Sequence, residues 1–374
     1  MLIKLKKIII FILLFISIDF IISLFLFNLI FLNLENIYKT DLQNRIFNKD
    51  YKYTFKPNVE FKSRYNDFLY TIKTNNFGFR DKDIKNIEIK NKLILFAGDS
   101  FLEGVGLNYE DTLLGHLNKN NKNDNTYLNS GVGSYSPFIY KKKIISFLNN
   151  NREIKLDRVV VLLDKSDPID DQSYLSEPNL FNKDNNERKY KKNLSEKFIS
   201  LAFLKLFGNY LDEKRRDLKY RFIIAKKYKT NFFKLNDKQI TAYKSIKGRR
   251  SLISYYDNSN KWENETKRFI LFSFKHLKEI ELFLSNENIQ LDVFLYPWPF
   301  ELTNKEVRKN YLNFINKTNK EFNLNIHSCY DYFLKENVLE QLDLIGSSFL
   351  LGDFHYNSEG YKILANCIKD KIKI

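Results

Sequence analysis

A serine hydroxyl follows a short apolar run about a quarter of the way along the chain. The run at 93–97 has the composition of a buried strand, and it ends in Gly98, Asp99 and Ser100. The carboxyl end of a strand is where α/β sheets place their chemistry. Ser100 can act as a nucleophile only if a base reaches its hydroxyl. We expect Asp99 to accept backbone N–H groups in the turn rather than to act as an acid.

A candidate base and its orienting group lie near the C-terminus. Asp353 and His355 are two residues apart, just before a segment that begins like a helix at Ser358. In a loop, this spacing lets both side chains face one side. The imidazole would then take the proton of Ser100, while the carboxylate fixes the tautomer and stabilises the imidazolium. The pattern predicts a Ser-His-Asp triad for acyl transfer.

Acyl transfer also needs donors for the charge that develops on the carbonyl oxygen, each worth about 3–4 kcal/mol. The backbone N–H of Ser100 is one candidate. Gly131 is a second, since glycines after a strand let the backbone approach a substrate. A third donor is expected in the loop 164–168, which follows a strand-like run at 159–163.

These blocks together resemble the SGNH (GDSL-type) hydrolase superfamily. The family's order is present as GDSF at 98–101, NSGVGSY at 129–135, a strand with a polar loop at 159–168, and DFHYNSEG at 353–360. The resemblance covers roughly residues 75–372, apart from an insertion. It implies Ser100 as nucleophile, His355 as general base and Asp353 as the third triad member, with the Ser100 and Gly131 amides lining the oxyanion hole.

The third block departs from the family pattern. The family usually has an Asn whose side-chain amide donates to the oxyanion, but this chain has Asp-Lys-Ser-Asp at 164–167. Ser166 could donate through its hydroxyl, or Lys165 or a water could take over. Alternatively, the oxyanion hole is weaker.

Two further motifs resemble bacterial membrane-anchored or exported members of the family. They are NNFGFRD at 75–81 and YPWP at 296–299, and such members are commonly linked to O-acetylation or deacylation of surface glycans. The implied reaction is hydrolysis or transfer of an acyl ester, with acetyl expected, on an extracytoplasmic glycan. Trp298 could stack on a sugar ring or form a rigid packed turn, and the two interpretations are balanced.

Two other functions stay open. One is a catalytically silent glycan-binding or assembly subunit of a surface-polysaccharide export complex, which the missing Asn favours. The other is a lipid-directed esterase, which an N-terminal anchor and a basic surface would suit. Hydrolase and transferase share the same triad, so the sequence does not separate them.

The elements that must position these residues alternate between strand and helix. Strand-like runs occur at 93–97, 127–129, 159–163 and 291–296, with helical patterns between them such as 137–149 and 267–284. This alternation predicts an α/β fold with a mostly parallel sheet covered on both faces. We expect a flavodoxin-like three-layer α/β/α core.

Three regions precede or interrupt that core. Residues 1–34 are predicted to be a cytoplasmic tip and transmembrane anchor, and residues 35–90 a linker and N-terminal extension with short strands. The hydrolase-like domain then spans 91–374, with a polar, basic, helical insertion at about 171–262 that includes a solvated loop at 182–192. Arg80 could bind an acidic substrate, but we expect it instead to anchor the extension by pairing with an acid.

The N-terminus predicts the location. Lys4, Lys6 and Lys7 precede an almost unbroken apolar run from Ile8 to about Leu34. The run exceeds the roughly 20 residues that cross a bilayer, and the lysines place the N-terminus in the cytoplasm. We expect a single-pass inner-membrane protein with a periplasmic or extracytoplasmic catalytic domain. Asp19 is either a tolerated polar residue or a contact to another membrane helix, and a membrane-protein partner is possible.

Composition excludes other classes. The net charge of +16 reflects lysines spread along the whole chain, and no nucleic-acid-binding motif accompanies them, so no nucleic-acid partner is expected. No Cys/His spacing suits a metal, and no cofactor is expected. Cys329 and Cys367 are expected to be two buried thiols rather than a disulfide. The remaining histidines are expected to be structural or solvated: His116 partly buried, His276 solvated and His327 beside the core.

Overall fold

The computed structural model describes residues 2–84, 87, 91–119, 121–176, 199–247 and 267–374. The chain divides into two compact units, one of residues 1–42 and 184–234 and one of residues 43–183 and 235–374. The solvated loop predicted at 182–192 lies outside the described residues.

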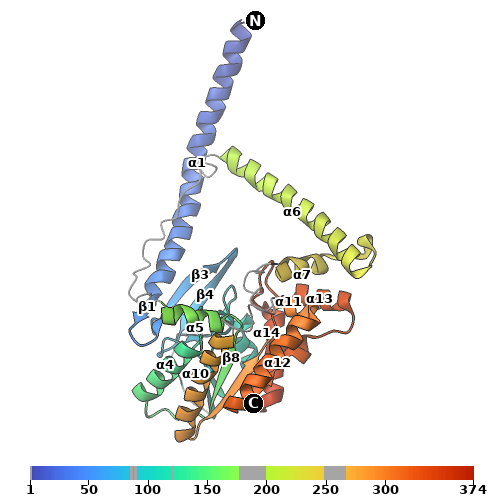
Figure 1. Ribbon diagram of the computed structural model, residues 1–374. Helices are drawn as coiled ribbons and strands as arrows, with labels where there is room; N and C mark the ends of the chain where they lie inside the picture. The colour runs from blue at the N-terminus through green and yellow to red at the C-terminus, as the bar shows by residue number, and fades with distance from the viewer. Residues whose placement is uncertain (1, 85–86, 88–90, 120, 177–198, 248–266) are drawn as a thin grey trace. The chain divides into compact units, whose positions relative to one another are not determined.

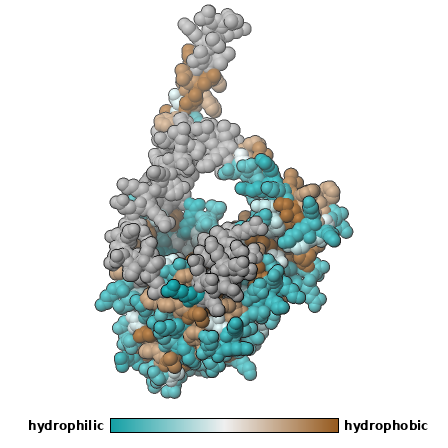
Figure 2. Space-filling view, viewed as in Figure 1, coloured by the Kyte–Doolittle hydropathy of each residue, from teal (hydrophilic) through white to brown (hydrophobic). Residues whose placement is uncertain are grey.

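The first unit is helical in its described part. It holds most of α1 (Leu2–Asn44), all of α6 (Ile199–Tyr228) and the 3-10 turn η4 (Phe232–Lys234). Between residues 10 and 22 the side chains of α1 are mostly apolar and exposed (Figure 2). Among the described residues, no helix combines the length and the apolar character needed to cross a membrane. The anchor inferred from the sequence stays a prediction.

The second unit is built on an eight-stranded sheet (Figure 1). Its strands are β3 (Glu60–Tyr65), β4 (Phe68–Thr74), β5 (Arg80–Asp81), β6 (Leu93–Ala97), β7 (Thr126–Asn129), β8 (Arg158–Leu163), β9 (Gln290–Leu295) and β10 (Ile326–Ser328). They lie in the order β10-β9-β8-β6-β7-β5-β4-β3. A separate antiparallel pair is formed by β1 (Arg45–Asn48) and β2 (Lys52–Phe55).

Five neighbouring strands, β10, β9, β8, β6 and β7, are parallel. Counted along the chain, they follow the flavodoxin-like order 2-1-3-4-5, in which the strand order reverses beside the first strand. The predicted α/β class and its mostly parallel sheet are therefore confirmed. Ser100 follows β6, the strand at which the order reverses.

The central strands β6 and β8 are apolar on both faces because helices cover both faces of the sheet. Every residue of β6 is buried. Leu93, Leu95 and Ala97 join a core cluster with residues of α4 (Pro137–Asn150), α10 (Lys267–Asn286) and α12 (Lys305–Phe322). The alternate residues Ile94 and Phe96 face the other side. There α3 (Leu113–Lys119) packs against α14 (Ser358–Ile372).

The N-terminal extension is part of the same sheet. Strands β3, β4 and β5 pair antiparallel and join its edge where Arg80 pairs with Asn129 of β7. The buried Arg80 guanidinium donates to the carbonyls of Glu103, Gly104 and Leu107. Arg80 thus anchors the extension as predicted, but to backbone carbonyls of the loop after Ser100 rather than to an acid.

The described part of the predicted insertion consists of helices. It begins within α5 (Asp167–Ser176) and contains α6 and α7 (Asp237–Lys247). Helix α7 packs on α13 (Val338–Ser348) and on the short α11 (Pro299–Thr303). Gly346 permits the close approach, because a Cβ there would lie 2.0 Å from the Lys238 carbonyl oxygen. The insertion therefore braces the helix that leads into the Asp353–His355 loop.

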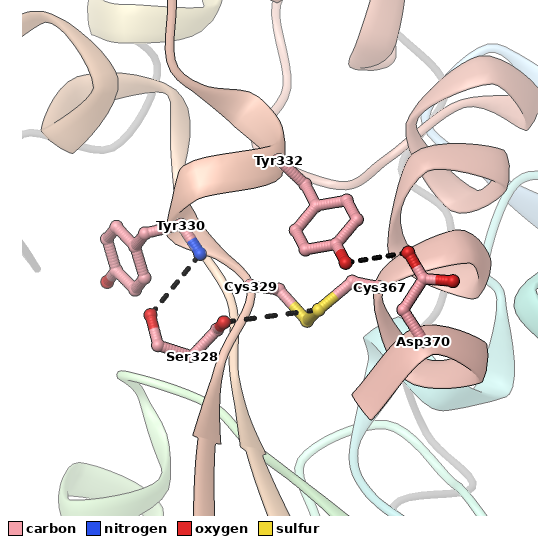
Figure 3. The surroundings of a disulfide bond; sticks show 6 residues. All are labelled: Ser328, Cys329, Tyr330, Tyr332, Cys367 and Asp370. Carbon is pink, nitrogen blue, oxygen red and sulfur yellow. Dashed lines mark hydrogen bonds between the residues drawn. A yellow bond between two sulfur atoms is a disulfide. The ribbon is translucent and has the colours of Figure 1, made fainter. Parts of the chain in front are cut away.

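Cys329 and Cys367 form a disulfide (Figure 3). The expectation of two buried thiols was wrong. Cys329 lies between β10 and the 3-10 turn η6 (Tyr330–Phe333), and Cys367 lies on α14. Their Cα atoms are 5.8 Å apart, which suits a bridge. Only the packing of α14 beside the end of β10 brings these two residues together, and a sequence separation of 38 gives no sign of it.

Candidate active site

A tight strand–turn–helix connection presents Ser100. It is the first residue of the short helix α2 (Ser100–Glu103). Gly98 is required before it, because a Cβ there would lie 2.8 Å from the Leu102 Cβ. Asp99 caps the helix by accepting the Phe101 N–H at 2.9 Å, as the sequence predicts for a structural acceptor. The helix ends at Gly104, whose φ of 76° lies in the left-handed region.

The structure brings Ser100, His355 and Asp353 together in the order a catalytic triad requires. Ser100 Oγ lies 2.8 Å from His355 Nε2, although the two residues are 255 positions apart. His355 Nδ1 lies 2.6 Å from Asp353 Oδ1. A proton on Nδ1, shared with the carboxylate, leaves Nε2 free to accept the proton of the Ser100 hydroxyl.

Aromatic side chains fix the plane of the imidazole. The rings of Phe101 and Phe354 lie 4.7 and 4.2 Å from that of His355, and Tyr65 meets it edge-on at 5.0 Å. The side chain of His355 is buried, with 2% of the residue exposed, whereas Ser100 is partly exposed. The imidazole of His355 is thus shielded from water while the Ser100 hydroxyl remains accessible.

The carboxylate of Asp353 is held through both oxygens. Oδ1 accepts the N–H groups of Phe354 at 2.8 Å and His355 at 2.9 Å besides the imidazole. Oδ2 accepts the hydroxyl of Tyr65 at 3.1 Å and the amide of Asn66 at 3.0 Å. Burial alone would raise the pKa of Asp353, but hydrogen bonds and the charge of His355 outweigh it and lower the pKa to about 2. The carboxylate is therefore ionised near neutral pH.

Sequence reasoning missed Tyr65 and Asn66. They lie at the turn of the β3–β4 hairpin, where Tyr65 pairs with Phe68. An Asn-Asp pair between two alternating runs is a detectable hairpin signal, and Asn66 has the positive φ of 50° that such turns favour. Nothing in that signal indicates contact with Asp353, which lies almost 290 positions later in the chain.

Gly131 lies near α2, but its amide already has a partner. Its N–H donates to Oδ1 of Asn129 at 3.0 Å. A Cβ at Gly131 would lie 2.7 Å from the Leu102 side chain. The glycine is therefore explained by packing of this loop on α2, and its predicted role in the oxyanion hole has no support from the geometry.

Gly133, in the same glycine-containing loop, lies close to Ser100. A Cβ built there would lie 3.7 Å from the Ser100 Cβ. The Gly133 N–H donates to Glu103 at 2.7 Å, and Arg45 donates to the same carboxylate at 2.7 and 3.2 Å. Burial raises the pKa of Glu103, but the Arg45 charge and these hydrogen bonds outweigh it and keep the pKa below its ordinary value. An ionised Glu103 thus fixes the loop beside Ser100.

The third block does not supply the expected donor. The Ser166 hydroxyl donates to Oδ1 of Asp164 at 2.6 Å, which occupies its one proton. The Lys165 ammonium is buried in an ion pair with Glu301 and donates to Tyr330. Neither side chain is therefore placed as the replacement for the family's Asn. The first amide of α2, that of Ser100, has no acceptor within its helix and remains the candidate.

Trp298 is a buried structural residue, which decides between its two interpretations. It is 3% exposed, and its ring packs against those of Phe354 at 4.6 Å and Phe101 at 6.4 Å. Its indole N–H donates to Oδ2 of Asp164 at 2.8 Å. Its burial and this hydrogen bond favour the rigid packed turn over the sugar contact.

Buried carboxyl groups lie behind the nucleophile. Asp99, Asp164 and Asp167 are each at most 2% exposed. Burial raises the pKa of Asp99 well above its ordinary value, and the charge of Asp164 adds to the shift. Burial and the charges of Asp99 and Asp164 likewise raise the pKa of Asp167. Asp167 accepts the Tyr140 hydroxyl on both oxygens, at 3.0 and 3.1 Å. Oδ2 of Asp99 lies 3.4 Å from Ser100 Oγ, so this shift in the pKa of Asp99 acts directly beside the Ser100 hydroxyl.

The other histidines lie outside this arrangement. His116 is 9% exposed and lies 3.1 Å from the Ser358 hydroxyl, in line with the structural role expected. His327 pairs with the buried Asp292 at 2.7 Å. His276 was expected to be solvated, but it is 6% exposed and pairs with Glu279, so that prediction was wrong. Among the described residues, no three His, Cys, Asp or Glu side chains cluster as a metal site would require.

No family model and no curated protein sequence matches the chain. Similar solved structures include a member of the lipolytic G-D-S-L family from Veillonella parvula (11% identity, 76% of this chain and 99% of that one, TM-score 0.36). They also include an acetylxylan esterase from Geobacillus stearothermophilus (12%, 76% and 96%, TM-score 0.35) and an esterase from Pseudoalteromonas (10%, 76% and 97%, TM-score 0.38).

Proposed function

We propose that the protein is a serine-dependent carboxylic ester hydrolase or O-acyltransferase whose triad is Ser100, His355 and Asp353. One observation carries the proposal: Ser100 Oγ lies 2.8 Å from His355 Nε2, and His355 Nδ1 lies 2.6 Å from Asp353 Oδ1. The order of the SGNH-type motifs along the chain supports the same assignment.

The reaction follows from this geometry. Ser100 Oγ attacks the ester carbonyl as Nε2 of His355 takes its proton, and the imidazolium is stabilised by Asp353. His355 then gives that proton to the departing alkoxide, which leaves an acyl group on Ser100. An acceptor hydroxyl next loses its proton to His355 and attacks the acyl carbonyl, and the proton returns to Ser100. Water as the acceptor makes the protein an esterase, and a sugar hydroxyl makes it an acyltransferase.

We propose an acetylated glycan outside the inner membrane as the substrate. The NNFGFRD and YPWP motifs support this through their resemblance to exported and anchored family members. Lys4, Lys6 and Lys7 before the apolar run 8–34 support an anchor with the N-terminus in the cytoplasm. The Cys329–Cys367 disulfide also supports export, because disulfides persist in oxidising compartments.

The hydrogen bonds already made by two of the predicted oxyanion donors favour a competing function without catalysis. Gly131 and Ser166 already have hydrogen-bond partners, which would suit a glycan-binding or assembly subunit that no longer catalyses. That alternative predicts a chain in which Ser100 does not react.

The deciding experiment uses the full-length chain in detergent. Wild type should react with a fluorophosphonate and hydrolyse an aryl acetate, whereas Ser100→Ala should do neither. The matched control is Ser173→Ala, which removes an exposed hydroxyl from α5. A wild type that neither reacts nor turns over, together with an unchanged surface-glycan phenotype in Ser100→Ala cells, would exclude the enzyme and leave the silent subunit.

Three further experiments define the substrate, the reaction and the location. An aryl-ester series should show its optimum at acetyl, and an optimum at long acyl chains would instead indicate a lipid-directed esterase. Mass spectrometry of an added oligosaccharide separates transfer from hydrolysis. Protease should reach the C-terminal domain in spheroplasts, and full protection in them would contradict the extracytoplasmic location.

A further inference from the structure

The turn of the β3–β4 hairpin contacts the triad carboxylate from outside the motif-bearing core. Among the described residues, both hydrogen bonds that reach Oδ2 of Asp353 come from this turn, one from the Tyr65 hydroxyl and one from the Asn66 amide. Residues of the 353–355 loop itself donate only to Oδ1. The second oxygen of the carboxylate is thus held by the N-terminal extension.

Tyr65 also contacts the base. Its hydroxyl oxygen lies 3.0 Å from Nδ1 of His355, so it can accept a share of the same N–H that Asp353 accepts. The phenol ring meets the imidazole edge-on at an interplanar angle of 82°. One side chain therefore restrains both the carboxylate and the ring that the carboxylate orients.

The hairpin is fixed against the loop that follows α2, the helix that begins with Ser100. Asn108 accepts the Thr71 N–H of β4 at 3.0 Å. A Cβ at Gly106 would lie 3.0 Å from Leu350, 3.5 Å from Phe68 and 3.7 Å from Tyr65, so these segments meet closely there. The turn is consequently tied to the Ser100 side as well as to the Asp353 side.

From these contacts we infer that Tyr65 and Asn66 are positioning residues of the triad, supplied by the N-terminal extension. The two donors hold the carboxylate in the plane that His355 needs. With both donors removed, Asp353 keeps its partners on Oδ1 but can rotate about its side-chain bonds, and the imidazole loses its fixed tautomer and direction. The inference rests on the proposed function only for its kinetic readout.

The test compares Tyr65→Phe and Asn66→Gly with Tyr70→Phe in the full-length chain. Glycine tolerates the positive φ of Asn66, so this change removes the amide and spares the backbone. Tyr70 is the matched control because it lies on the same hairpin and its hydroxyl pairs with Ser63 at 3.3 Å, away from the triad. We expect Tyr65→Phe to lower kcat about tenfold with KM changed less than about twofold. Tyr70→Phe should leave both nearly unchanged.

A second readout does not depend on turnover. The chain has four histidines, so histidine-selective ¹⁵N labelling gives few signals. His355 should show a single Nδ1–H tautomer in wild type and in Tyr70→Phe, and a mixture in the Tyr65→Phe/Asn66→Gly double variant. If wild type fails to turn over, the proposed function fails and this spectrum still decides the inference. A double variant with the wild-type His355 spectrum, or a Tyr65→Phe loss confined to KM, would overturn it.

Discussion

The hydroxyl of Ser166 donates to Oδ1 of Asp164 at 2.6 Å, and the Ser166 amide donates to the same oxygen at 2.8 Å. The other oxygen of Asp164 accepts the Tyr296 hydroxyl and the Trp298 indole, each at 2.8 Å. Four donors thus converge on one buried carboxyl group. The loop after β8 is organised around Asp164, in the place where the sequence suggested a donor to the substrate.

Ser166→Ala should therefore have little effect on catalysis. We expect kcat/KM on an aryl acetate to fall less than about threefold, whereas removing an oxyanion donor costs about 10²–10³-fold. Steady-state kinetics beside Ser173→Ala would measure this. A hundredfold loss of kcat with an unchanged melting temperature would show that the hydroxyl turns to the substrate during the reaction.

Trp298→Phe should affect stability rather than substrate binding. Phenylalanine keeps an aromatic ring beside Phe101 and Phe354 but removes the donor to the buried Asp164. Loss of that hydrogen bond should lower the free energy of unfolding by about 1–3 kcal/mol, measured by chemical denaturation. KM for an acetylated oligosaccharide should stay within about twofold of wild type. A large rise in KM at unchanged stability would restore the sugar-stacking role.

Removing the disulfide should destabilise the segment that carries the base. The bridge closes a loop of 38 positions that contains Asp353 and His355. In the chain-entropy model such a loop contributes about 4 kcal/mol. Cys329→Ala/Cys367→Ala should therefore unfold at lower denaturant than oxidised wild type, and a reductant should change only the wild type. Equal midpoints for the two proteins under oxidising conditions would contradict the bridge.

The buried Asp171 makes stability depend on pH in a defined direction. Burial raises its pKa from 3.8 to about 6, despite the hydroxyls of Ser136 and Ser273 that donate to it. A carboxyl group whose pKa is raised on folding contributes stability that is fully present below about pH 4. That stability is lost as the pH rises through about 6. The shift corresponds to about 3 kcal/mol.

Asp171→Asn removes this titration. Relative to wild type, the variant should gain about 2–3 kcal/mol in the free energy of unfolding between pH 4.5 and 7.5. Denaturant titrations at the two pH values would measure it, with the exposed Asp83→Asn as control. A wild-type-to-variant difference that stays constant with pH would refute the assignment.

Local features of the sequence determined much of the fold. The apolar run at 93–97 is β6 with the same bounds, and the helical pattern at 137–149 is α4 to within one residue. Such elements are specified by the periodicity of neighbouring side chains, which can be read from the chain. The motif order likewise led to Ser100, Asp353 and His355, which the structure places in hydrogen-bonding contact.

Tertiary packing decided the surroundings of that triad. Tyr65 and Asn66 reach Asp353, and Cys329 reaches Cys367, because distant segments of the chain are brought together by the sheet order and by α14. Ser166 and Trp298 both face Asp164, since a buried carboxyl group must gather donors and takes them from whatever lies near it. The sequence by itself determined which residues could do the chemistry. Only the folded structure decided which side chains support them and which merely lie nearby.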